Sequence, residues 1–324
     1  MQELKWDRRV LVTGASGFIG CWAVKDLLAR GYEVHAVHSG RAKPQRQSEL
    51  DGATLHAADL FDPAQADALV AKLRPSHLLH FAWIATPGLY WTSPDNLIWV
   101  EASLRLLRGF AAGGGKRVVM AGSCAEYDWS RAGICSEAET PLATDGGRSA
   151  ALYAASKVML SKQLFTFAAE TGISAAWGRI FFPYGPYEHP NRLVPSVIKA
   201  LLEGRAAECT SGSQVRDFLH STDLGGAFAA LLDSAVEGAI NLGSGERVSV
   251  ADLAKLISSR IGRPELLRLG AKPTPAGEPP LLVPDLGRMR RELAWKPRFT
   301  LAAGIDDAIA WWRGQTGVPG ASRS

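Results

Sequence analysis

The sequence predicts an α/β protein in which a doubly wound parallel sheet is followed by a smaller C-terminal α/β lobe. Between residues 9 and 180, short β-branched apolar runs alternate with longer amphipathic segments, and a turn with three glycines joins the first two. Strands that alternate with helices form a parallel sheet covered on both faces. After about residue 181, Pro- and Gly-rich connections indicate a second, less regular part.

The alternation of apolar runs and amphipathic segments places the individual strands and helices. We expect strands at residues 9–14, 33–38, 54–60, 77–83, 117–123 and 174–180. The segments between them have the spacing of amphipathic helices, expected at residues 20–31, 62–75, 96–114 and 151–170. Ligands of such sheets bind beyond the carboxyl ends of the strands, so we expect the lobe to close over that edge.

The composition is typical of a globular protein, with 47% hydrophobic and 21% charged residues among 324. The net charge is only +4 and basic residues are interspersed with acidic ones, which argues against nucleic-acid or membrane-surface binding. No apolar run of about 20 residues predicts a membrane span, and no signal peptide is evident. The cysteines lack metal-ligand spacing, so we expect no metal site and a reducing, cytoplasmic setting; they are Cys21, Cys124, Cys135 and Cys209.

The glycine turn predicts a Rossmann-type dinucleotide site. Gly14, Gly17 and Gly20 follow a strand and open a helix, where a tight turn lets the backbone approach a pyrophosphate at the helix N-terminus. A plain strand-to-helix turn would carry the same glycines. From this turn the expected cofactor-binding residues are Gly14, Ser16, Gly17, Phe18, Ile19 and Gly20.

The end of the second strand favours NADP(H) over NAD(H). The strand ends near His38, about 18 residues after Gly20, where a ribose-binding carboxylate is expected and none is present. Hydroxyl and cationic groups follow instead, and they suit a 2′-phosphate unless they only solvate a loop; they are Ser39, Arg41, Lys43 and Arg46.

The ends of the third and fourth strands complete the expected cofactor site. Asp59 could bond the adenine amino group, although a helix cap would look the same, and Leu60 follows it. At the fourth strand the expected residues are Phe81, Ala82 and Trp83.

Three residues predict redox chemistry at a carbonyl or alcohol. Tyr153 and Lys157 are four apart in a helical pattern, so both lie on one face. The ammonium, helped by a positively charged nicotinamide, favours the phenolate. Ser123 ends the fifth strand and can hold the reacting oxygen while Tyr153 transfers the proton.

Together these motifs resemble the extended short-chain dehydrogenase/reductase family, in its branch acting on nucleotide-activated sugars. The resemblance covers nearly the whole chain, including "RIFFPYGPYEHPNRLVPS", "VRDFLHSTDLGG" and "AINLGSGERVSVADL". It implies a dinucleotide-binding domain at residues 1–180, to which segment 214–245 returns, and a substrate lobe at 181–213 and 246–316, with a tail at 317–324. It also implies a nucleoside diphosphate sugar as substrate and a homodimer.

The family pattern also implies substrate-binding residues. Arg216 falls where the family binds pyrophosphate, with a salt bridge as the alternative, and Glu278 lies in the segment that closes over the nucleotide. The full expected set is Trp83, Ser123, Cys124, Phe182, Arg192, Arg216 and Glu278. Trp83, Tyr90 and Trp91 could form a sugar or base platform or fill the core.

Departures from the family pattern narrow the reaction. Dehydratases of the family carry Asp-Glu directly after the position of Ser123, whereas Cys124 and Ala125 stand here, so we do not expect a dehydratase. Cys124 is offset by one residue from the cysteine of epimerising reductases, and inert packing is its alternative. Trp99 and Phe182 replace asparagines usual in the family.

The leading functional hypothesis is an NAD(P)H-dependent reductase of a nucleoside diphosphate 4-keto-6-deoxyhexose. The first alternative is an NAD-dependent 4-epimerase, which would retain its cofactor and is less suited to a site without a ribose-binding carboxylate. The second alternative is a non-catalytic dinucleotide-sensing protein, which could dispense with Tyr153 and Lys157.

Overall fold

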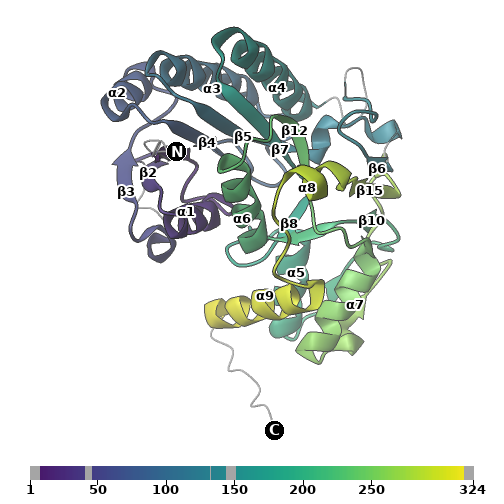
Figure 1. Ribbon diagram of the computed structural model, residues 1–324. Helices are drawn as coiled ribbons and strands as arrows, with labels where there is room; N and C mark the ends of the chain where they lie inside the picture. Colours follow the sequence, from purple (N-terminus) through teal and green to yellow (C-terminus); the bar gives the residue numbers. More distant parts are fainter. Residues whose placement is uncertain (1–7, 41–45, 132, 144–150, 317–324) are drawn as a thin grey trace.

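The large sheet has seven parallel strands in the order β12-β7-β5-β4-β1-β2-β3 (Figure 1). The computed structural model describes residues 8–40, 46–131, 133–143 and 151–316. The strands are β1 (Arg9–Thr13), β2 (Glu33–His38), β3 (Thr54–Ala57), β4 (His77–His80), β5 (Arg117–Ser123), β7 (Ser174–Ile180) and β12 (Gly238–Leu242). The predicted doubly wound α/β fold is confirmed.

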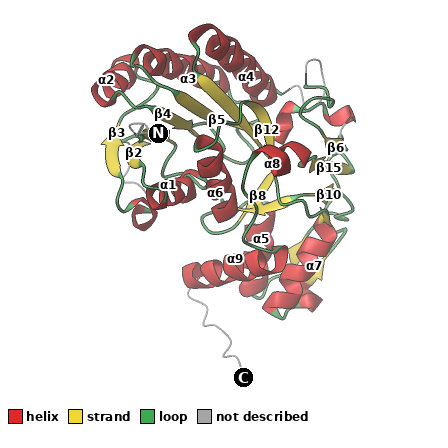
Figure 2. Cartoon of the chain, in the orientation of Figure 1, coloured by secondary structure: helices red, strands yellow, loops and turns green. Residues whose placement is uncertain are grey.

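Helices cover both faces of this sheet, as Figure 2 shows in red around the yellow strands. One face carries α1 (Gly20–Ala29) and α6 (Ser221–Leu232). The other carries α2 (Pro63–Leu73), α3 (Asp95–Ala112) and α4 (Leu152–Thr171). None of the helices in the described parts of the chain is long and apolar enough to cross a membrane.

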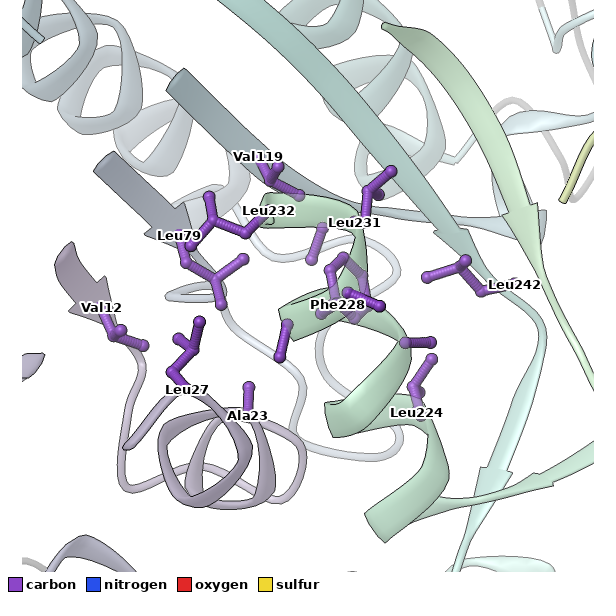
Figure 3. Close-up of a cluster of buried hydrophobic side chains, with 14 of the residues drawn as sticks. Val12, Ala23, Leu27, Leu79, Val119, Leu224, Phe228, Leu231, Leu232 and Leu242 are labelled. Atoms are coloured by element: carbon purple, nitrogen blue, oxygen red, sulfur yellow. The ribbon is translucent and has the colours of Figure 1, made fainter. Parts of the chain in front are cut away.

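Two buried clusters hold the helices to the sheet because consecutive strand residues face opposite sides. In β1, Val10 and Val12 join the cluster under α1 and α6, whereas Leu11 joins the cluster under α2, α3 and α4. Figure 3 shows the first cluster, where Leu27 of α1 and Phe228 of α6 meet the strands. Each such fully buried side chain contributes roughly 1.5–3 kcal/mol.

Strand boundaries agree with the expectation at β2, β5 and β7 and differ at β3 and β4. The expected runs extended to residues 60 and 83, but the ladder ends at Ala57 and His80. Beyond these points the chain turns away into loops at the carboxyl edge, where Ala58 and Phe81 still donate to the ends of β2 and β1. The residues expected to bind the cofactor at these two strand ends, Asp59, Leu60, Phe81, Ala82 and Trp83, therefore lie in loops.

The second part is built from α5 (Leu193–Leu202), α7 (Val250–Ile261) and α9 (Leu301–Thr316), which share a third buried cluster. Small sheets join it to the large one: β13-β10-β15-β6, β11-β8 and β14-β9. Their strands are β6 (Ile134–Cys135), β8 (Phe182–Tyr184), β9 (Ala207–Glu208), β10 (Val215–Arg216), β11 (Phe218–His220), β13 (Val248–Ser249), β14 (Leu267–Arg268) and β15 (Leu281–Pro284). A short helix, α8 (Gly287–Glu292), packs near β12.

The segment expected to return to the large sheet divides between the two parts. Helix α6 and strand β12 lie on the large sheet, while β10 and β11 pair within the small sheets. Gly225 of α6 approaches α1 so closely that a Cβ there would stand 2.5 Å from Cβ of Trp22. The expected tail at 317–324 lies outside the described residues.

Candidate active site

The glycine turn between β1 and α1 admits no side chain at any of its three glycines, and at Gly17 a Cβ would stand 2.9 Å from the Gly14 carbonyl oxygen. A Cβ on Gly20 would stand 2.2 Å from the carbonyl oxygen of Gly14, and one on Gly14 would stand 2.8 Å from the Ala82 nitrogen. Gly14 also has φ +64°, a conformation that glycine adopts without strain. The backbone therefore makes a tight cradle at the carboxyl edge of the sheet.

The first turn of α1 opens into this cradle. Its N-cap residue, Ile19, makes no side-chain cap hydrogen bond, and the N–H groups of Cys21 and Trp22 bond to the carbonyls of Gly17 and Ile19. The positive end of the helix dipole therefore lies at the turn without a capping side chain. Ser16, Phe18 and Ile19 are half-buried in the same turn. An uncapped helix start behind a glycine cradle fits the pyrophosphate of a dinucleotide.

The loop after β2 brings cationic and hydroxyl groups toward the glycine turn. His38 accepts a hydrogen bond from the Gly40 nitrogen at 3.2 Å, and Ser39 is exposed. Arg46 donates to the carbonyl of Ser16 in the glycine turn and, at 3.2 Å, to the carbonyl of Tyr187. Arg41 and Lys43 lie outside the described residues.

The loops after β3 and β4 line the other side of the turn. The Asp59 carboxylate accepts from the Phe61 nitrogen at 3.0 Å, and Leu60 is buried in the core under α2 and α3. Phe81 packs edge to face on Phe228, with 4.8 Å between ring centroids. Ala82 contacts Gly14 through its backbone, and Trp83 lies farther along the same loop.

The structure brings Ser123, Tyr153 and Lys157 together at the carboxyl edge. Ser123 ends β5, and its hydroxyl hydrogen-bonds with the Tyr153 phenol. Tyr153 begins α4, and its backbone nitrogen donates to the Trp91 carbonyl at 3.1 Å. Lys157 lies one turn later and donates to the Ala121 carbonyl at 3.0 Å.

Burial sets the protonation of both ionisable members. The Tyr153 side chain has its pKa raised by burial, which outweighs the Ser123 hydrogen bond that lowers it. Burial also lowers the pKa of Lys157, with the Glu126 carboxylate opposing that shift. By itself the dry site favours the neutral phenol, a proton donor. That Lys157, together with a positively charged nicotinamide, favours the phenolate stays a prediction.

Aromatic side chains surround the ammonium and the phenol. The Trp83 ring lies with its centroid 3.6 Å from Lys157 Nζ. Tyr90 and Trp91 contact the Tyr153 ring edge to face, at 4.9 and 5.8 Å between centroids. Arg192, which begins α5, lies 5.4 Å from the Tyr90 ring. The loop after β4 and the second part of the fold therefore meet above Tyr153.

The acid that follows Ser123 is committed to an internal ion pair. Glu126 is fully buried and accepts from Trp177 Nε1 and from Arg179 Nε, both at 2.9 Å. It lies in a single 3-10 turn, Cys124–Glu126, and also accepts from the Ser123 nitrogen at 2.7 Å. These three donors hold the carboxylate within an internal network.

Cys124 packs in a small buried cluster. Its neighbours there are Tyr127, Cys135, Phe181 and Leu282. Burial raises the pKa of its thiol to about 12, so the thiol stays protonated at neutral pH. All four cysteines are buried free thiols.

Arg216, Phe182 and Glu278 come together beside the second part of the fold. The Arg216 guanidinium is buried, lies 5.3 Å from the Phe182 ring centroid and pairs with the Glu278 carboxylate. Its other terminal nitrogen donates to its neighbour Val215. Asp217, the acid next to Arg216 in the sequence, does not form the alternative salt bridge with it. Its carboxylate instead accepts from the nitrogens of Ser244 and Gly245.

Sequence reasoning missed two features near the site. A buried polar chain runs from Thr13 Oγ1 to His80 Nδ1 at 2.6 Å and from His80 Nε2 to Ser103 Oγ at 2.9 Å. Glu188 is buried near Arg192, and burial raises the pKa of its carboxyl to about 8. Both depend on contacts between separate segments or on burial, which no spacing pattern marks. Within the described chain, no group of three or more His, Cys, Asp or Glu side chains is suited to a metal ion.

A dinucleotide cradle next to a serine, a tyrosine and a lysine at one sheet edge defines an NAD(P)-dependent redox enzyme. Residues 10–243 match the sequence model of the NAD dependent epimerase/dehydratase family. The chain belongs to that family, and the predicted membership in the nucleotide-sugar branch of the extended short-chain dehydrogenases/reductases is confirmed.

Individual relatives resemble the chain over nearly its whole length. The dTDP-4-dehydro-6-deoxy-D-allose reductase of Streptomyces bikiniensis is 30% identical, covering 96% of this chain and 98% of the relative. Two solved structures are similar: the UDP-glucose 4-epimerase of Thermotoga maritima with UDP-glucose (TM-score 0.84, 22% identity, 95% and 99% covered) and that of Thermus thermophilus with NAD (TM-score 0.78, 26% identity, 94% and 99% covered).

Proposed function

We propose that the protein is an NAD(P)H-dependent reductase that acts on the C4 keto group of a nucleoside diphosphate 4-keto-6-deoxyhexose. The observation that carries the proposal is the half-buried phenol of Tyr153, which hydrogen-bonds with Ser123 and lies one helical turn from Lys157. Reduction of a ketone needs a proton donor at the oxygen, and a phenol is such a donor. The 30% identical relative is a reductase of a 4-dehydro-6-deoxy sugar nucleotide.

Each residue has a role in this reduction. Bound NAD(P)H supplies a hydride to the carbonyl carbon. The Ser123 hydroxyl donates a hydrogen bond to the carbonyl oxygen, and the Tyr153 phenol gives that oxygen its proton as the negative charge develops. The Lys157 ammonium stabilises the phenolate that Tyr153 becomes.

The glycine cradle would hold the pyrophosphate of the cofactor. A side chain at Gly14, Gly17 or Gly20 would collide with backbone of the turn, so these glycines keep it tight, and the uncapped start of α1 would direct the positive end of its dipole at the pyrophosphate. The preference for NADP(H) is supported by the exposed Ser39 and by Arg46, whose guanidinium lies against the glycine turn. We expect Arg41→Ala to raise the Kd of NADPH much more than that of NADH; equal losses would show that this loop does not read the 2′-phosphate.

The second part of the fold, residues 181–213 and 246–316, is proposed to bind the nucleotide sugar. The Arg216 guanidinium is held by Glu278 beside Phe182, and a pyrophosphate could take the place of that carboxylate with bidentate geometry. Arg192 extends from the start of α5 toward Tyr90, next to Tyr153. Both positions would bring substrate anions to the catalytic edge.

A 4-epimerase is the second candidate because the two similar solved structures are UDP-glucose 4-epimerases. An epimerase passes through both oxidised and reduced cofactor in one cycle and therefore retains it. Ser39 and Gly40, the described residues directly after β2, carry no carboxylate for the adenine ribose, and Glu49 farther along pairs with Lys25; this supports the reductase.

Two measurements separate these candidates. Mass spectrometry of ligands released from freshly purified protein should show NADP or an empty site, whereas stoichiometric NAD would favour the epimerase. With a nucleoside diphosphate 4-keto-6-deoxyhexose, about one equivalent of NADPH should be oxidised per sugar reduced. The fall in absorbance at 340 nm measures this oxidation. No oxidation of either reduced cofactor would refute the reductase.

The phenol gives the sharpest test of the chemistry. We expect Tyr153→Phe to lower kcat by roughly 10²–10⁴-fold and to leave the Kd of NADPH nearly unchanged. Tyr32→Phe is the matched control, because its hydroxyl bonds Asp233 far from the site. A Tyr153→Phe variant of near-normal rate would remove the phenol from the mechanism.

A homodimer through α3 and α4 is also proposed. Leu97 and Ile98 of α3 are 49% and 41% exposed, and Met159 of α4 is 44% exposed. Large apolar side chains gathered on two adjacent helices favour an interface between copies. Ile98→Asp should convert a dimer to a monomer in analytical ultracentrifugation; a wild-type monomer would refute the dimer.

The four free thiols fit a cytoplasmic protein.

A further inference from the structure

The Lys157 ammonium is covered by an indole face. The Trp83 ring centroid lies 3.6 Å from Nζ, well within the range of a cation–π contact. Within the described chain, the one hydrogen-bond acceptor of this ammonium is the Ala121 carbonyl, at 3.0 Å. An ammonium has three N–H donors, and the Ala121 carbonyl accepts one of them.

The Trp83 ring is itself fixed from two sides. Its indole N–H donates to Asn96 Oδ1 at 2.8 Å, and the Asn96 amide donates to the Tyr90 carbonyl at 2.7 Å and the Ser93 carbonyl at 2.8 Å. The Trp99 ring stacks on it, with 6.2 Å between centroids and 25° between planes. A ring held by a hydrogen bond and a stack keeps one orientation toward Nζ.

The same loop also holds Tyr153. Asn96 ties down the Tyr90 backbone, and the Tyr90 ring contacts the Tyr153 ring at 4.9 Å between centroids. The next residue, Trp91, accepts the backbone N–H of Tyr153 at 3.1 Å. The loop after β4 thus positions both the ammonium and the phenol.

We propose that Trp83 is a positioning residue that fixes the Lys157 ammonium over its indole face and sets the protonation of that ammonium by excluding water. The proposal rests on the proposed function only in that Lys157 belongs to the redox site. It assigns to Trp83 a role toward the protein's own lysine, distinct from contact with cofactor or substrate.

Two effects of the ring act in opposite directions. The negative face of the indole attracts the cation and favours the charged form. Exclusion of water disfavours the charged form, and for buried ammonium groups this is the larger effect. Burial accordingly lowers the pKa of Lys157.

Several ionisable groups face this lysine from the elements packed around it. Glu126 opposes the lowering of its pKa, although Arg179 pairs with that carboxylate. His80 of β4 has its own pKa lowered to about 3 by burial and by Lys157, so it is neutral. Tyr153 on the same helix is a neutral phenol at neutral pH. Glu126, Arg179 and His80 have hydrogen bonds that do not involve Trp83, whereas Tyr153 is linked to Trp83 through Asn96 and Tyr90.

A series at position 83 separates the two effects. Trp83→Leu keeps an apolar cover without the aromatic face, so the Lys157 titration should move to lower pH, with about a tenfold change in protonation equilibrium. Trp83→Ala admits water, so the titration should move toward that of ordinary lysines. Trp83→Phe keeps both a cover and an aromatic face and should stay near wild type.

The titration can be followed directly in the protein without substrate. In protein labelled with ¹³C-lysine, the Lys157 Cε signal is assigned by its loss in Lys157→Met and followed from pH 6 to 10. Trp311→Leu is the control, because that ring contacts Tyr187 and Trp312 in the second part of the fold. The acidic limb of the kcat profile should shift in parallel with each Cε midpoint.

The outcomes distinguish the two proposals. The role of Trp83 is supported if the Lys157 titration midpoint shifts in opposite directions in Trp83→Leu and Trp83→Ala and is unchanged in Trp83→Phe and Trp311→Leu. This holds even if the enzyme reduces no keto sugar. A failure to reduce a keto sugar would refute only the proposed function. Equal titration in wild type, Leu and Ala would overturn the Trp83 proposal whatever the enzyme's activity. Should Trp83→Ala fail to fold, the Leu and Phe pair still decides.

Discussion

The Glu126 carboxylate offers a prediction whose size follows from its contacts. It is fully buried and faces Arg179, which is 3% exposed, with 2.9 Å between Oε2 and Nε. Glu126→Gln keeps an oxygen for the Ser123 and Trp177 N–H groups but removes the charge that balances Arg179. The variant therefore leaves a cation buried and unpaired.

An orphaned buried charge costs about 3–5 kcal/mol. Because total stabilities lie at about 5–15 kcal/mol, this loss is a large fraction of the free energy of unfolding. Arg179→Met in the same chain removes the orphaned cation, so the double variant should be more stable than Glu126→Gln alone, with a coupling energy of about 1–3 kcal/mol.

Urea unfolding followed by circular dichroism at pH 7.5 measures these differences. The control is Glu203→Gln, because Glu203 pairs with Arg205 at the surface, where the side chains are 36% and 62% exposed. Surface pairs contribute about 0–1 kcal/mol. The reasoning is refuted if Glu126→Gln lowers the free energy of unfolding no more than Glu203→Gln does. It is also refuted if adding Arg179→Met to Glu126→Gln restores none of that free energy.

Two further predictions concern the cofactor cradle and the buried histidine. Gly20→Ala places a Cβ 2.2 Å from the Gly14 carbonyl, so calorimetry should show dinucleotide binding weakened by at least about tenfold; unchanged affinity would contradict the cradle. His80 has a pKa lowered to about 3 against an ordinary 6.5, so the unfolded chain binds the extra proton between these values. Stability should fall as pH decreases through that window, by about 1.4 kcal/mol per unit, and less steeply in His80→Gln; identical urea midpoints against pH would argue against a neutral His80.

The repeating part of the fold could be predicted from local pattern alone. Strands β2, β5 and β7 have the expected bounds because each is a short apolar run between turn signals. The order of Gly14, Ser123, Tyr153 and Lys157 along such a sheet places them at one edge, since parallel strands share their carboxyl ends. The order of these residues along the chain was therefore enough to predict that they lie at the same edge of the sheet.

Contacts between distant segments could not be predicted. Strand β6 is two residues long, shorter than most strands, and is defined by its pairing with β15, about 150 residues later. The contact between Trp83 and Lys157 joins a loop to a helix, and the raised pKa of Tyr153 depends on burial by several segments. Packing across the chain decides such features, and no local period records it.

The outermost strand of the large sheet is made late in synthesis. Strand β12 pairs with β7, yet Gly238–Leu242 follow more than fifty residues after Ile180. A ribosome-bound chain that has emerged only as far as α5 therefore presents β7 as an open edge and leaves α1 without its partner α6. Such an intermediate exposes a template for aggregation, so we expect the growing polypeptide to depend on chaperones until its last third leaves the ribosome.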